Sequence, residues 1–204
     1  MITNKDRSKY IGASDTKYVM MNWQTKTFQK WWLIKLGLEQ NDLENKYTLA
    51  GNNYEHKIVD ALNIKGIIKD KQIVILDRLR INLDANTENE IHEVKTYIYE
   101  NGFDIKKHKD YIEQVQVQMY GSGIYNAYID AYGLLEEEYR NFFEDIDLER
   151  LTSYKIEYNE EWINKKYLPR ITILIQCLKE MRFPTTEEYN KIKEEKRKKE
   201  KQNE

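Results

Sequence analysis

The sequence predicts a mixed α/β domain built around one β-sheet, and three observations support this fold class. Helix-like and strand-like segments alternate in the order helices, three strands, one helix, further strands and a final helix. Hydrophobic residues make up 40% of the chain, with 16 Tyr and 4 Trp, which is typical of a folded protein. A length of 204 residues suits one medium-sized domain with a proper core.

Three helices are expected before the first strand. Ser14 is a suitable N-cap for a short helix that runs to about Met21. A second helix is expected over residues 27–36, because large apolar side chains recur there every three to four residues: Phe28, Trp31, Trp32 and Leu36. A third helix over residues 48–63 carries Glu55 beside its apolar positions.

Strand-like segments follow, and they predict the central sheet. Residues 67–76, 79–85 and 90–97 are rich in Ile and Val and are separated by short polar turns. Further strands are expected over residues 126–135 and 151–158. These segments would form one mixed sheet.

Two more helices complete the predicted domain. One covers residues 111–120, and a long one covers about residues 160–181 with an expected kink at Pro169. We place a single domain at residues 1–185. Residues 186–204 end in a run of Lys and Glu, so we expect a charged tail that is disordered or a frayed helix.

Composition and charge exclude several kinds of protein. The net charge of −2 indicates no global attraction to nucleic acid, although a carboxylate-rich metal site would offset local lysines in this sum. The single cysteine, Cys177, excludes an intramolecular disulfide and a cysteine-rich zinc site. No segment approaches the roughly 18 apolar residues of a membrane span, and the N-terminus has no apolar signal region. We therefore expect a soluble protein of a reducing intracellular compartment, with no membrane partner.

The most informative segment is the predicted hairpin that carries Asp84, Glu93 and Lys95. Residues two apart on a strand share a face, so Glu93 and Lys95 point together while His92 points away. Asp84 on the preceding strand can reach the same point, and the Val94 carbonyl offers a further oxygen. Such hard oxygen ligands suit Mg²⁺ or Mn²⁺. The alternative is a surface hairpin whose charged residues form cross-strand ion pairs.

Three alternating glutamines mark the helix that follows. Gln114 and Gln118 are four residues apart and share one face, whereas Gln116 faces elsewhere. A carboxamide can both donate to and accept from a water, so it can orient a nucleophile without titrating. The alternative is an ordinary polar helix face.

The N-terminal segment offers a possible anion site. A helix N-terminus capped by Ser14 presents free backbone N–H groups, and Arg7 could add a bidentate contact to the same phosphate. Glu55, in the third helix, becomes relevant to chemistry only if that helix packs beside the hairpin. Helix capping and solvent-exposed charges are the simpler alternatives for both segments.

Taken together and in this order, the four segments resemble the lambda-exonuclease or YqaJ-type branch of the PD-(D/E)XK nucleases, which includes the viral alkaline exonucleases. The resemblance spans residues 7–120. In this family the second strand usually ends in a Ser/Pro-Asp-Gly turn, where this chain has Asn82-Leu-Asp84-Ala. The matching pieces are Arg7 with Ile11-Gly-Ala-Ser14-Asp, Gly51-Asn-Asn-Tyr-Glu55, Asp84 with Glu93-Val-Lys95, and the glutamine helix from Tyr111 to Tyr120.

The resemblance implies a restriction-endonuclease-like core, in which helices flank a central mixed β-sheet, and it implies a role for each matching residue. Asp84, Glu93 and the Val94 carbonyl would bind the catalytic Mg²⁺, for which Mn²⁺ is a possible substitute. Lys95 would polarise the attacking water and Gln114 would help to orient it. Glu55 would act as an additional carboxylate, through water or a second metal. Arg7 and Ser14 would bind the 5′-phosphate of the DNA, and Gln118 would have a supporting role.

The implied activity is that of an exonuclease, which digests one strand of linear double-stranded DNA from 5′ to 3′. The 3′ single strands that remain would serve an annealing partner protein in phage-type recombination, in a bacterial cytoplasm. Some members of the family close into trimeric rings around DNA. Two alternatives stay open: an endonuclease of the same fold in restriction or repair, and a catalytically silent module that binds DNA ends or a partner.

Overall fold

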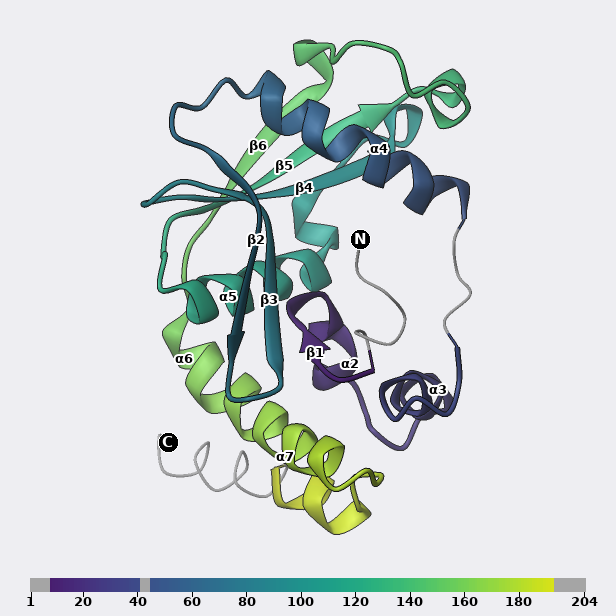
Figure 1. Cartoon of the computed structure of the whole chain (residues 1–204), viewed down its shortest axis with the longest axis vertical. Helices are drawn as coiled ribbons and strands as arrows, with labels where there is room; N and C mark the ends of the chain where they lie inside the picture. The colour runs from purple at the N-terminus through teal and green to yellow at the C-terminus, as the bar shows by residue number, and fades with distance from the viewer. Residues whose placement is uncertain (1–7, 41–44, 193–204) are drawn as a thin grey trace. The chain divides into compact units, whose positions relative to one another are not determined.

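The computed structural model describes residues 8–40 and 45–192, and the chain falls into two compact units (Figure 1). Unit 1 comprises Met1–Asn41, Val74–Arg80 and Asn159–Glu204, and unit 2 comprises Asp42–Ile73 and Ile81–Tyr158. The predicted domain boundary at residue 185 stays a prediction. Arg7 lies outside the described residues.

Unit 2 holds most of the mixed sheet that the sequence predicts. Its two central strands, β4 (Ile91–Ile98) and β5 (Ala127–Leu134), run parallel over eight residue pairs. Strand β6 (Leu151–Ile156) pairs antiparallel with β5. On the other side, β4 pairs antiparallel with β3 (Leu79–Asn86), which in turn pairs with β2 (Ile68–Ile75). This combination of parallel and antiparallel pairs confirms the predicted fold class.

Two helices cover opposite faces of this sheet (Figure 1). Helix α4 (Lys46–Ala61) begins where the Asn45 side chain accepts hydrogen bonds from the backbone N–H groups of Tyr47 and Thr48. Its apolar side packs on one face of the sheet and forms a buried core with the side chains of Val94, Tyr132 and Leu134. Helix α5 (Lys109–Ser122) reaches the other face and ends at Gly123, whose φ of 72° suits glycine.

Unit 1 is held together by an aromatic core. Strand β1 (Ile11–Gly12) pairs in parallel with Leu79 and Arg80, and a 3₁₀ turn (Ala13–Asp15) leads into α2 (Thr16–Met20) and then α3 (Lys26–Lys35). The aromatic rings of α3 are buried: Phe28, Trp31 and Trp32. They pack against one another at centroid distances of 5.4 to 5.9 Å, and the ring of Phe28 stacks on that of Trp32.

The predicted C-terminal helix is divided by a π-helical turn. It begins as α6 (Glu160–Trp162), passes through the π turn (Ile163–Tyr167) and continues as α7 (Leu168–Lys179). Pro169 lies in the first turn of α7, where the absence of its N–H costs least, so the π turn takes up the irregularity expected at this proline. Residues 186–192 are helical again and bury Tyr189 and Ile192.

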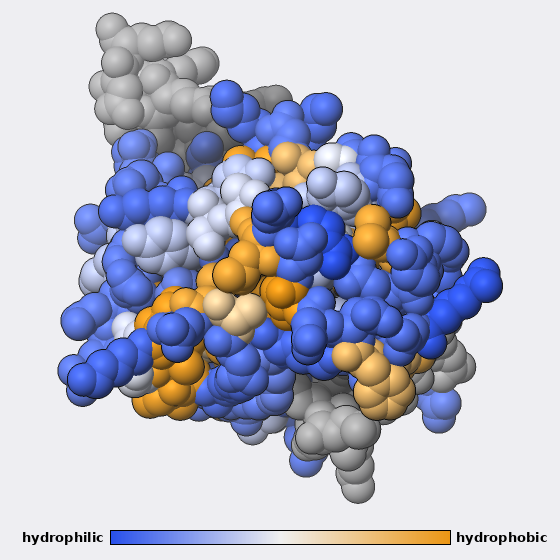
Figure 2. All heavy atoms as spheres, turned by 90° about the horizontal axis from the view of Figure 1, so that it is seen from above, coloured by the Kyte–Doolittle hydropathy of each residue, from blue (hydrophilic) through white to orange (hydrophobic). Residues whose placement is uncertain are grey.

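The face drawn in Figure 2 is mainly hydrophilic, and small apolar patches on it are separated by charged and polar side chains. Scattered patches of this kind are usual for a folded monomer. No helix within residues 8–40 and 45–192 is long and apolar enough to cross a membrane.

Candidate functional site

The candidate site lies where β3 separates from β4 in unit 2. The two strands pair only at Ala85 with His92 and at Asn86 with Ile91. One residue further along β3, the Asp84 carboxylate accepts the backbone N–H of Val94 at 2.9 Å. The side chain thus replaces the strand partner that Val94 would otherwise require. Because the N–H and C=O of one residue point to the same side of a strand, the Val94 carbonyl faces the same gap as Asp84.

Glu93 is the centre of the hydrogen-bond network on this face. Its Oε1 accepts hydrogen bonds from Lys95 Nζ and Gln114 Nε2, each at 2.5 Å. Its Oε2 accepts a further hydrogen bond from Gln118 Nε2. Glu93 is only 2% exposed, so these three donors satisfy a charge that burial would otherwise make very costly.

The alternation predicted for β4 and for α5 is confirmed. Glu93 and Lys95 point together, while His92 turns away and pairs with Asp130 at 2.8 Å. Gln114 and Gln118 both reach Glu93, whereas Gln116 donates to the backbone carbonyl of Glu157 at 2.8 Å. The period of two on the strand and the spacing of four on the helix therefore bring these groups to one point.

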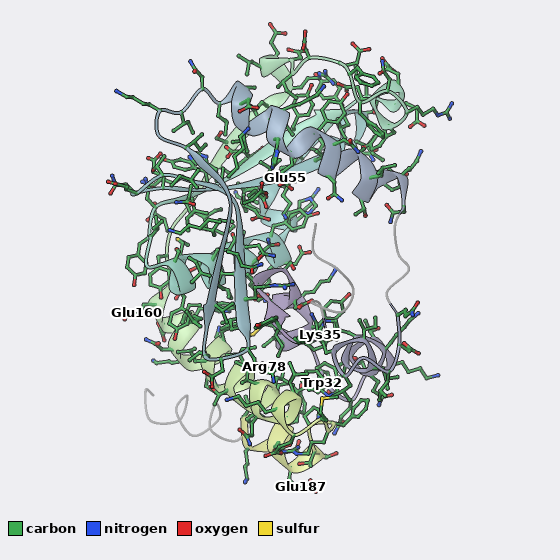
Figure 3. The ribbon with its side chains drawn as sticks, viewed as in Figure 1. Trp32, Lys35, Glu55, Arg78, Glu160 and Glu187 are labelled. Carbon is green, nitrogen blue, oxygen red and sulfur yellow. The ribbon has the colours of Figure 1, made fainter. Side chains whose placement is uncertain are left out.

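Two carboxylates of the site carry perturbed pKa values. Burial raises the pKa of Asp84 well above its usual range, and the negative charges of Glu93 and Glu55 raise it further. Burial also raises the pKa of Glu55, with Glu93 as the next cause. Figure 3 shows the Glu55 side chain between α4 and the strands. The helix that carries Glu55 therefore packs beside the predicted hairpin, as a role in the chemistry requires.

Lys95 balances part of this negative charge. Burial by itself would lower the Lys95 pKa, but Glu93 and Asp84 outweigh that effect and the pKa is raised. The ammonium also lies over the ring of Tyr111, with Nζ 5.0 Å from the ring centroid. Lys95 is therefore held in its protonated form, ready to donate a hydrogen bond.

The donor set fits a divalent cation. Three carboxylates, those of Asp84, Glu93 and Glu55, influence one another electrostatically, and Lys95 is ion-paired with Glu93. Formally, three negative charges face one positive charge, which leaves an excess of two. Oxygen ligands with such an excess of negative charge suit a divalent cation.

The sequence did not point to three features of the site. Gln118 also donates to the backbone carbonyl of Asn82 at 3.0 Å, which links β3 to the same network. Tyr111 contributes the ring beside Lys95. His56 Nε2 contacts the Asp70 carboxylate at 2.9 Å, next to Glu55. Backbone carbonyls and ring faces carry no signal in a sequence, and Asp70 is an unremarkable acid in a charged strand.

The expected helix cap at Ser14 is wrong. Ser14 is exposed and lies inside the 3₁₀ turn, and no side chain caps α2. Asp15 shapes this turn instead, because its carboxylate accepts the Gly12 N–H at 2.8 Å and contacts Lys35 Nζ at 2.6 Å. Lys35, labelled in Figure 3, belongs to the same unit. A phosphate contact by Ser14 stays a prediction.

The fold is shared with solved structures of exonucleases. The alkaline exonuclease LHK-Exo from Laribacter hongkongensis matches with a TM-score of 0.59 and 18% identity, over 97% of this chain and 96% of that chain. LHK-Exo in complex with dAMP matches with a TM-score of 0.62 and 17% identity, over 98% and 97% of the two chains. A phage-related exonuclease from Haemophilus somnus 129PT matches with a TM-score of 0.58 and 18% identity, over 87% and 95%. No family model and no curated protein sequence matches the chain. At these identities the comparison establishes the fold: that of the PD-(D/E)XK-like exonucleases.

Proposed function

We propose that the chain is a metal-dependent deoxyribonuclease that degrades linear double-stranded DNA from 5′ to 3′. One observation carries this proposal: the Glu93 carboxylate, Lys95 and Gln114 converge beside Asp84, at the point where β3 leaves β4. The similarity of the fold to exonuclease structures adds support.

We assign each group a role that its contacts support. Asp84, Glu93 and the Val94 carbonyl would hold Mg²⁺, or Mn²⁺ in its place, with Glu55 as an additional carboxylate. The cation would supply Lewis-acid stabilisation of the charge that develops on the phosphate. Lys95, protonated and fixed between Glu93 and Tyr111, donates a hydrogen bond to the attacking water or the phosphate. Gln114 accepts from or donates to the same water and sets its direction.

The remaining parts of the proposal concern the substrate and its setting. Arg7 and Ser14 would hold the terminal 5′-phosphate, which favours a strand end over an internal phosphodiester. The product would be 3′ single-stranded tails for an annealing protein, in phage-type recombination in a bacterial cytoplasm. The chain would assemble into a trimeric ring around the duplex, and light scattering of the purified protein tests that assembly.

A cutting assay with matched variants tests the activity. Linear duplex with 5′-phosphate ends, the same duplex with 5′-hydroxyl ends and closed circular duplex are incubated with Mg²⁺ and protein. We expect loss of the linear duplex, faster with 5′-phosphate, and an intact circle. Lys95→Ala should abolish cutting, while Lys165→Ala, which removes a half-exposed lysine paired with Glu161, should not.

Each alternative predicts a different result. Cutting of the circle would indicate an endonuclease of the same fold. Absence of metal-dependent cutting on every substrate would indicate a silent module that binds DNA ends. Full activity of Lys95→Ala would show that the site has been assigned to the wrong residues.

A further inference from the structure

A second group of potential metal ligands lies beside the candidate site in unit 2. One ligand atom each from Glu55, His56 and Asp70 lies within 4.8 Å of the other two. Glu55 and His56 are neighbours in α4, and Asp70 belongs to β2, so the group joins a helix to a strand. His56 Nε2 already contacts the Asp70 carboxylate at 2.9 Å. The nearby ammonium of Lys69 is engaged by Asp60 at 2.5 Å.

The donor set differs in kind from that of Asp84, Glu93 and Val94. Those residues offer oxygen atoms alone, whereas His56 adds an imidazole nitrogen. Imidazole favours Zn²⁺, Co²⁺ and related transition metals over Mg²⁺, while a set of one nitrogen and two carboxylates leaves coordination positions for water.

We propose that Glu55, His56 and Asp70 form a transition-metal site, adjacent to the Mg²⁺ site, with Zn²⁺ as its preferred ion. Because Glu55 belongs to both donor sets, occupation by Zn²⁺ withdraws its carboxylate from the candidate nuclease site. Zn²⁺ then inhibits DNA cutting by a route that does not require it to replace Mg²⁺. The inhibitory effect rests on the proposed nuclease function, and metal binding itself does not.

Metal binding is tested with Co²⁺ as a spectroscopic substitute for Zn²⁺, on protein that carries no histidine tag. Equilibrium dialysis and the visible absorption of bound Co²⁺ report affinity and nitrogen coordination. Substitution of a residue that only supports a metal ligand weakens metal binding by roughly 10- to 100-fold. His56→Ala and Asp70→Asn each remove a proposed ligand, so each should weaken Co²⁺ binding by at least that factor. Both side chains are more than half exposed, at 52% and 63%, so neither change should disturb folding.

Two control variants separate this site from its surroundings. His108→Phe keeps the ring stack of His108 with Phe103 and Tyr111 and should leave Co²⁺ binding at the wild-type level. Asp84→Asn removes a ligand of the candidate Mg²⁺ site and should leave the Co²⁺ spectrum unchanged. Wild-type Co²⁺ binding by His56→Ala, or loss of the spectrum in Asp84→Asn, would overturn the proposal.

Activity provides the second measurement. Micromolar Zn²⁺ should slow Mg²⁺-dependent cutting by the wild-type protein and have at least tenfold less effect on His56→Ala. Equal inhibition of both proteins by Zn²⁺ would overturn the regulatory part. A protein that binds Co²⁺ through His56 but cuts no DNA would refute the nuclease function and uphold the metal site.

Discussion

Replacement of Asp84 by asparagine separates the charge of the candidate site from its hydrogen bonds. The asparagine Oδ1 can still accept the Val94 N–H, so the contact that joins β3 to β4 survives. The change removes one of three mutually repelling carboxylates. We therefore expect the metal-free variant to be at least as stable as the wild-type protein, which is a common result when a strained functional site is relieved.

Asp84→Asn should, in contrast, reduce the stabilisation of the protein by bound metal. A ligand at 100 times its Kd stabilises the folded state by about 2.7 kcal/mol, which is roughly 5–10 °C in Tm for a chain of this size. We expect Mg²⁺ at saturating concentration to raise the wild-type Tm by this amount. The Asp84→Asn variant should show a shift of at most a few degrees, because the carboxylates of Glu93 and Glu55 alone remain. Asp60→Asn, which removes a 68% exposed carboxylate on α4, should keep the wild-type shift.

The pH dependence of the metal-free stability provides an independent test of the same argument. The pKa of Asp84 is raised in the folded chain, so the folded state binds more protons than the unfolded state above the unfolded pKa of about 3.9. The contribution of Asp84 to metal-free stability therefore falls as pH rises from there through the folded pKa. Thermal unfolding in the presence of chelator should show the difference in Tm between Asp84→Asn and wild type growing over that range. A metal-free variant that is less stable than wild type and keeps the full Mg²⁺ shift would refute the reasoning.

Three further predictions concern other parts of the structure. Gln114→Met should lower the rate of DNA cutting by about 100-fold, because the attacking water is no longer oriented. Gln116 lies on the same helix but donates to the backbone carbonyl of Glu157, so Gln116→Met should keep most of the activity in the same assay. Arg150→Met should destabilise unit 2 by about 3–5 kcal/mol in urea unfolding, because it leaves the 1% exposed Glu138 without its bidentate partner. The control Lys165→Met, at an exposed ion pair, should cost less than about 1 kcal/mol. An equally small loss for Arg150→Met would contradict this prediction. Arg182 and the Thr185 N–H lower the pKa of Glu188 to about 2. Glu188→Gln should therefore cost about 1–2 kcal/mol of stability at pH 7, after allowance for the partial exposure of Glu188, and this cost should vanish as pH falls from about 4.5 to 2. An equal cost at both ends of that range would exclude the ion pair as its source.

The helices and strands could be predicted because their signals are local. The alternation of Glu93 and Lys95 on a strand and the spacing of Gln114 and Gln118 on a helix depend on backbone geometry alone. The helix α3 likewise followed from the spacing of its large apolar side chains. Each of these predictions needed only residues that are close together in the sequence.

The features that could not be predicted depend on contacts between distant segments. The separation of β3 from β4 beyond Ala85 is visible only in the pairing of the strands. The approach of Asp70 to His56 depends on how β2 passes α4. Ser14 was a reasonable cap by residue type, but Asp15 forms stronger contacts with Gly12 and Lys35 and draws the chain into a 3₁₀ turn. Tertiary contacts overrode a local preference there.

The position of Lys95 affects how its own substitution must be interpreted. In the metal-free chain, Lys95 neutralises Glu93 and part of the field from Asp84, so Lys95→Ala removes both a hydrogen-bond donor and the charge that opposes three carboxylates. Loss of a buried partner of this kind destabilises a protein strongly. An inactive Lys95→Ala protein therefore supports a catalytic role only if it is folded under the assay conditions. Double substitution with Glu93→Gln tests the stability part alone, because it also removes a ligand of the candidate metal: it should recover the stability that Lys95→Ala loses, and no recovery would contradict the ion pair as the source of that loss.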